Sequence, residues 1–187
     1  RLLYPELRKE GDALSEDTSL NREDSFLKNY RRSKPSGFNR EKAYLIKEDR
    51  LPKGEFGMMH VYLPVDKLKE AAHKYNASIN EYLVAVFTWS VYQECLHGMP
   101  SKKALRIAVP VNLRPFFDSE TMKNFFVVVS AEFRPEKESY SFEEVIDIVK
   151  ESLRKQITKE HMEDLFSYSV SNQRNVFLRP IPLFLKH

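Results

Sequence analysis

The chain has 187 residues, of which 42% are hydrophobic and 30% are charged, and its net charge is +3. This length is enough for one sizeable core or for one lobe of a larger protein. The small net charge, without a basic stripe interleaved with aromatic residues, argues against nucleic acid as a partner. Five glycines argue against a glycine-rich phosphate loop, and a single cysteine excludes internal disulfides and cysteine metal clusters.

The two ends of the chain differ in composition. Residues 1–40 are polar, and we expect them to form a linker or crossover from a preceding N-terminal lobe, because the sequence begins at Arg1 without methionine. Residues 41–187 are then a C-terminal lobe, and the apolar tail from Val176, which has no capping residue, predicts truncation there. Because no apolar run of 18 residues and no signal peptide is visible, we expect no membrane span and a cytoplasmic location.

The first part of the lobe predicts two strands and a helix. A short edge strand is expected within residues 41–48, and Met58–Leu63 alternates in the manner of a second strand. Pro64 then opens a helix that continues to about Tyr75.

A second helix is predicted to start at a capping box. Ser78-Ile-Asn-Glu81 has the serine and glutamate at the spacing that lets each satisfy the other's backbone N–H. The helix runs to about Leu96, and from Tyr82 to Tyr92 it is apolar on nearly every side. Such a helix is expected to be buried or wedged between two layers.

Two strongly patterned strands follow in residues 105–134. Apolar residues alternate from Leu105 to Leu113, which predicts a strand with one buried face. Pro110 has no N–H for a ladder, so we expect this strand to be bulged or near an edge there. Phe125 to Phe133 is almost wholly apolar, which predicts an inner strand covered on both faces.

A second capping box, Ser141-Phe-Glu-Glu144, predicts a helix to about Lys159, after which residues 160–169 continue or restart it. The elements come in the order strand, helix, helix, strand, strand, helix, helix. This order predicts an α/β (α+β two-layer) fold, in which helices flank a mixed β-sheet.

Three segments of the chain resemble one enzyme superfamily. Val109-Pro-Val-Asn-Leu-Arg114, followed after about ten residues by Asn124-Phe-Phe-Val127, resembles the P-V-N-x-R … G-N-F segment of the chloramphenicol-acetyltransferase-like superfamily. Asn76-Ala-Ser-Ile-Asn-Glu-Tyr-Leu-Val-Ala85 is similar to that family's helix, and residues 141–187 resemble bacterial alcohol acetyltransferases. The resemblance covers roughly residues 20–187. The superfamily includes alcohol acyltransferases, wax-ester synthases and the condensation domains of peptide synthetases.

The resemblance implies one lobe of that fold and an acyl transfer from a coenzyme A thioester to an alcohol or similar hydroxyl. Acyl-CoA is then a co-substrate, and no covalently bound cofactor and no metal is expected. The family's catalytic motif, H-H-x-x-x-D-G, is absent from this chain. We therefore expect the catalytic histidine in the missing N-terminal lobe and an inactive fragment, because a general base near neutral pKa is what the reaction needs.

The candidate site residues are those that the family motif or the strand pattern singles out. Arg114 and Asn124 belong to the motif, and an arginine at a strand end can fix a loop through a bidentate pair with a carboxylate. Asn112 shares a face with Arg114, and Ser130 could donate to an oxyanion, although a packed structural serine is the alternative. His60, within a predicted strand, is a candidate for the wall of a substrate channel, with an ordinary core or surface histidine as the alternative.

Two other functions remain open from the sequence. The chain could be a binding or interaction module that has lost its chemistry, or a condensation-type domain that uses carrier-protein substrates. In every case the apolar helix, the apolar strand and the apolar tail predict that this lobe is covered in solution, either by the N-terminal lobe or by a second copy of the chain.

Overall fold

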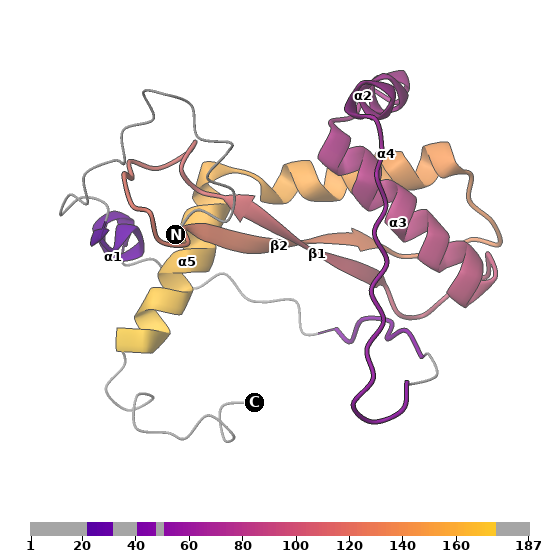
Figure 1. The fold of residues 1–187 in the computed structure, drawn as a ribbon, viewed down its shortest axis with the longest axis horizontal. Coiled ribbons are helices and arrows are strands. Elements are labelled where there is room, and N and C mark those ends of the chain that lie inside the picture. Colours follow the sequence, from indigo (N-terminus) through magenta and orange to yellow (C-terminus); the bar gives the residue numbers. More distant parts are fainter. Residues whose placement is uncertain (1–21, 32–40, 48–50, 175–187) are drawn as a thin grey trace.

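The computed structural model describes residues 22–31, 41–47 and 51–174 (Figure 1). Within these ranges the elements are five helices and one two-stranded antiparallel sheet, which confirms the α+β two-layer class. Their bounds are α1 Ser25–Asn29, α2 Val65–Lys74, α3 Ile79–Leu96, β1 Leu105–Asn112, β2 Phe126–Phe133, α4 Phe142–Gln156 and α5 Lys159–Arg174. The predicted tail from Val176 lies outside the described residues.

The two strands form one regular antiparallel pair. Leu105 lies opposite Phe133, Pro110 opposite Val128 and Asn112 opposite Phe126, without a bulge. The Leu113 N–H donates to the Phe125 carbonyl at 3.0 Å, so odd-numbered residues of both strands direct their backbone groups into the pair. Pro110 therefore faces away from β2, where its missing N–H removes no ladder bond. The expected edge position of this proline is confirmed.

The sheet has one buried face. The odd-numbered side chains of β2 are buried, whereas Phe126 is 44% and Val128 is 52% exposed. The prediction that this strand is covered on both faces is therefore wrong for the part of the chain that the structure describes. The run of apolar residues is present, but the described helices bury only the odd-numbered side chains of it.

Helices α3 and α4 cover the buried face and form the main core. The inward stripe of α4 is fully enclosed and consists of Val145, Ile146, Val149 and Leu153. Tyr92 of α3 meets the ring of Phe133 edge to face, with 5.5 Å between centroids. Leu83 and Phe87 are exposed on the opposite side of α3. This apolar helix is therefore packed on one side, and the predicted second layer is not seen among the described elements.

A second, smaller core lies at the other end of the sheet. It joins the connection between the strands to α5 and consists of Leu113, Phe117, Phe125, Val127, Met162 and Phe166. The ring of Phe26 in α1 meets Phe125 at 4.9 Å and Phe166 at 5.9 Å. Residues 22–31, which lie in the predicted linker, thus contribute a helix that packs against the second core.

Two predicted strands are not strands in the structure. Residues 41–47 make one backbone bond to the sheet region, from the Tyr44 N–H to the Ala104 carbonyl at 2.9 Å. Residues 58–63 are exposed and pair with no other described segment. The alternating side chains suit a strand, but a strand also requires a neighbour that satisfies its backbone groups, and neither segment has a ladder of that kind in the described ranges.

Both capping boxes are confirmed, and the first one also links two helices. The Ser78 N–H donates to Glu81 at 2.7 Å, and the Glu81 N–H donates to the Ser78 hydroxyl at 3.2 Å. Arg154 of α4 donates from Nε to the same carboxylate at 2.7 Å. Burial raises the pKa of Glu81, but the hydrogen bonds from Arg154 and Ser78 outweigh it and leave the pKa below its usual value.

We expect Glu81→Ala to lower the free energy of unfolding by about 1–2 kcal/mol, because it removes a helix cap and a partly buried hydrogen-bonded pair. Glu144→Ala is the matched control, since it removes the exposed capping box of α4 and an exposed ion pair with Lys137, but no link between two helices. Chemical denaturation measures both variants. Because the pKa of Glu81 is lowered on folding, its contribution should persist above its ordinary pKa and disappear as the pH falls through the lowered value. An equal loss in both variants would contradict the role of the Glu81–Arg154 pair.

Candidate functional site

Three predicted site residues lie together at one end of the hairpin. Asn112 ends β1, Arg114 follows it, and Asn124 precedes β2. With Pro110, Phe125 and Phe126, they line an open hollow of about 260 Å³, which we call the Arg114 hollow. The antiparallel register creates this grouping, because it brings the end of β1 and the start of β2 to the same edge of the sheet.

Arg114 holds the connection between the strands. Its Nη2 donates to the carbonyl oxygens of Thr121 at 2.9 Å and Lys123 at 2.7 Å. Its Nη1 and its backbone N–H both donate to the Asn112 Oδ1, at 3.1 Å and 3.2 Å. One guanidinium thus ties the start of the loop to its end. The predicted role in fixing a loop matches this geometry, but the described partners are carbonyls and an amide, and not the expected carboxylate.

Helix α1 fastens the same loop from outside. The Thr121 hydroxyl donates to the Glu23 carbonyl at 2.9 Å, and the Ser25 and Ser119 hydroxyls lie 2.7 Å apart. Asn29 donates from Nδ2 to the Asp118 carbonyl at 3.0 Å. None of these residues was among the site residues predicted from the sequence. The available signal was Asp24, whose carboxylate caps α1 by accepting from the backbone N–H groups of Phe26 and Leu27.

The charges around α1 favour this arrangement near neutral pH. The hydrogen bond from the Ser25 hydroxyl has the largest effect on the pKa of Glu23 and lowers it, whereas burial has the next largest effect and raises it. Smaller contributions from Lys28 and the Glu120 N–H leave the pKa below its usual value. Hydrogen bonds to Asp118 and Glu23 raise the pKa of Lys28. One contact with the loop, from the Glu120 N–H to Glu23 Oε1 at 3.3 Å, uses the ionised carboxylate, and this contact should weaken as the pH falls through the lowered pKa.

The other two predicted site residues lie elsewhere. Ser130 lies four residues along β2 from Phe126, a separation of about 13 Å. The Gln156 side chain binds the backbone N–H and the carbonyl of Ser130. His60 is exposed in the unpaired segment, and its Nε2 lies 2.9 Å from the sulfur of Met58. Neither residue lines the Arg114 hollow.

The chemistry available in the hollow is that of hydrogen bonding. Its lining offers one guanidinium and two amides, which can bind a carbonyl or an anionic oxygen. The lining contains no group that titrates near neutral pH, so the hollow cannot itself remove a proton from an acceptor. Over the residues described here, no group of three or more metal-binding side chains is found, and no helix is long and apolar enough to cross a bilayer.

Comparisons with known proteins give no match: no family model, no curated protein and no solved structure matches this chain. The resemblance to acyltransferases is therefore carried by the sequence motifs alone.

We expect Arg114→Ala to lower the free energy of unfolding by about 1 kcal/mol and to loosen residues 113–125. The loss should be modest because Arg114 and Lys123 are exposed, so the Lys123 carbonyl can bind water when the guanidinium is removed. Thermal melts measure stability, and limited proteolysis measures access to the loop. Arg114→Lys is the control, since it keeps the charge but not the planar set of donors. Full recovery by lysine, or an unchanged loop in the alanine variant, would contradict the bracing role.

Proposed function

We propose that this chain is one lobe of a cytoplasmic acyltransferase, which transfers an acyl group from a coenzyme A thioester to an alcohol or similar hydroxyl. The observation that carries the proposal is the convergence of Asn112, Arg114 and Asn124 in one hollow. These are the residues that the family motif singles out, and they lie at opposite ends of a loop in the sequence.

The local geometry supports a positioning role for Arg114. Its Nη atoms donate to Thr121, Lys123 and Asn112, so the main role of the residue is to hold the shape of the loop. Asn124 lines the hollow, and its amide can donate to a carbonyl or accept from a hydroxyl. The proton of the acceptor must go to a base outside the hollow, which in this proposal belongs to the other lobe.

A thiol-release assay with acetyl-CoA and a panel of alcohols tests the catalytic part. We expect no turnover from residues 1–187, because the loss of a general base typically costs about 10²–10⁴-fold. Sustained turnover that His60→Ala abolishes would contradict the proposal and make His60 the base.

Calorimetric titration with coenzyme A tests the binding part. We expect weak but measurable binding that Asn124→Ala reduces several-fold. Asn80→Ala is the matched control, because this asparagine is exposed on α3 and lies outside the hollow. Absence of binding at millimolar ligand would favour the second candidate, a non-enzymatic interaction module. The observation in its favour is that the lining of the hollow has no side chain able to act as a base.

A further inference from the structure

Side chains of α4 form hydrogen bonds with the outer edge of β2 along half of its length. Even-numbered residues of this strand face away from β1, and helix α4 binds two of them. The Ser130 N–H donates to Gln156 at 3.1 Å, and the Glu132 N–H donates to the Ser152 hydroxyl at 2.9 Å. These side chains close that half of the edge in the way that natural proteins protect edge strands.

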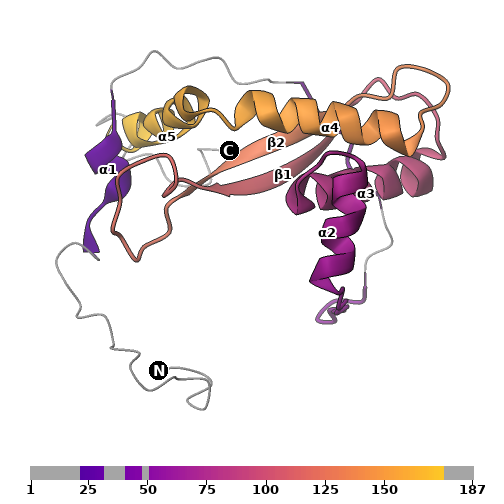
Figure 2. The same ribbon diagram turned by 90° about the horizontal axis from the view of Figure 1, so that it is seen from above.

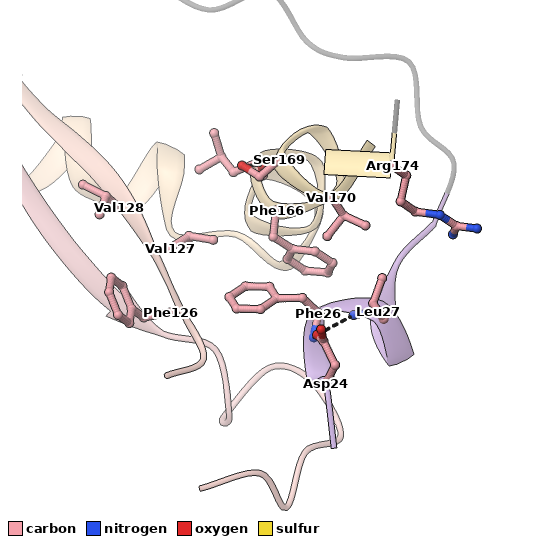
Figure 3. Close-up of a pocket in the computed structure, with 11 residues that line it drawn as sticks. Asp24, Phe26, Leu27, Phe126, Val127, Val128, Phe166, Ser169, Val170 and Arg174 are labelled. Carbon is pink, nitrogen blue, oxygen red and sulfur yellow. Dashed lines mark hydrogen bonds between the residues drawn. The ribbon is translucent and has the colours of Figure 1, made fainter. Parts of the chain in front are cut away.

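The other half of the edge is open. The outward N–H and carbonyl groups of Phe126 and Val128 have no hydrogen-bond partner in the described part of the chain. A groove of about 790 Å³ lies beside them, between β2, α1 and α5. Figure 3 shows the rings of Phe26 and Phe166 directed into this groove opposite Phe126. The position thus offers both unpaired backbone groups and an apolar wall, which are the two requirements for adding a strand.

The outer edge of β1 is a much poorer place for a new strand. Pro110 faces that edge and cannot donate a hydrogen bond. At the start of β1, the Tyr44 N–H binds the Ala104 carbonyl, and Arg106 Nη1 donates to the Glu41 carbonyl at 2.6 Å. Residues 41–47 therefore occupy that side, which leaves β2 as the receptive edge.

The same molecule carries a segment suited to such an edge. Residues 56–63 are exposed throughout, and the described chain gives their backbone no hydrogen-bond partner. Met59 is 87% and Tyr62 is 90% exposed, and Phe56, Met58, Val61 and Leu63 are also exposed. The trace runs apart from the sheet before it reaches α2 (Figures 1 and 2). The segment therefore has the composition and alternation of a strand, but no described segment pairs with it.

We propose that residues 56–63 of one copy pair with the open β2 edge at Phe126 and Val128 of a second copy. A two-fold dimer makes the exchange reciprocal, so each copy gives one strand and receives one. Phe56 and Tyr62 of both copies alone would bury on the order of 600–1,000 Å², at about 150–250 Å² for each aromatic side chain. A specific interface needs about 1,000 Å² and a stable one buries about 1,200–2,000 Å². These four aromatic side chains therefore supply a large part of the area, and Met58, Val61 and Leu63 must supply the rest.

Sedimentation equilibrium of the 187-residue chain over a range of concentrations tests the proposal. We expect a monomer–dimer equilibrium that Val128→Pro weakens by about tenfold or more. Proline at this position removes an N–H that faces away from β1, so the β1–β2 ladder stays intact. Val61→Pro and Tyr62→Pro are made in parallel. Because a strand bonds its partner through alternate residues, one of the two must weaken the dimer to a similar degree.

Val128→Thr and Val61→Thr are the matched controls, since they keep the N–H and the β-branched shape. Circular dichroism verifies folding of every variant. If Val128→Pro fails to fold, Val128→Lys replaces it and places a charge in the apolar groove, with the same expected loss. A monomer at all concentrations overturns the proposal, and so does a dimer that none of the proline variants weakens.

Cross-linking between copies identifies the surfaces directly. In a Cys95→Ala background, a copy with Val61→Cys is mixed with a copy with Val128→Cys and treated with a short bis-thiol reagent. We expect a mixed cross-linked dimer. The control pair combines Val61→Cys with Leu83→Cys, an exposed apolar position on α3 away from the groove. Equal yields from the two pairs would contradict the assignment of the β2 edge.

Discussion

The position of α4 against β2 is the constraint on which the rest of the structure depends. Its stripe Val145, Ile146, Val149 and Leu153 closes the main core over the inward face of the hairpin. The same helix binds the outward backbone of Ser130 and Glu132 through Gln156 and Ser152. One element thus fixes which face of the sheet is buried and where the edge of β2 is closed.

The groove beside β2 and the Arg114 hollow both lie beyond the end of α4, and their positions depend on how α4 packs against β2. Phe126 and Val128 remain exposed because α4 does not reach them, and α5 with α1 leaves a groove beside them. At the same end of the sheet, Arg114 and α1 hold the loop that shapes the Arg114 hollow. Phe126 lines both the groove and the hollow, so occupation of the groove by a strand would reach the wall of the proposed ligand site.

Local features of the fold could be predicted from the sequence. Ser78–Glu81 and Ser141–Glu144 are capping boxes as expected, because the capping interaction involves only residues four positions apart or fewer. The alternating burial of β1 and the edge position of Pro110 were also predicted correctly. Both depend on local properties, namely the alternation of apolar residues and the missing N–H of proline.

Features that depend on distant partners could not be predicted. Residues 58–63 have the composition of a strand, but pairing requires a neighbour that no local pattern specifies. The apolar residues of β2 indicated cover on both faces, whereas helices supply it on one. For the site, the motif residues Asn112, Arg114 and Asn124 do meet, but the partners of Arg114 are backbone carbonyls, which carry no signature in the sequence.

Amide hydrogen exchange along β2 in dilute, monomeric protein tests the one-sided closure of this sheet most directly. The alternation of backbone directions predicts strong protection at Val127 and Val129, which face β1, and at Ser130 and Glu132, which α4 binds. It predicts fast exchange at Phe126 and Val128. Protection of these two amides equal to that of Val127 and Val129 in the monomer would contradict the account, because it would mean that another part of the chain already closes the edge.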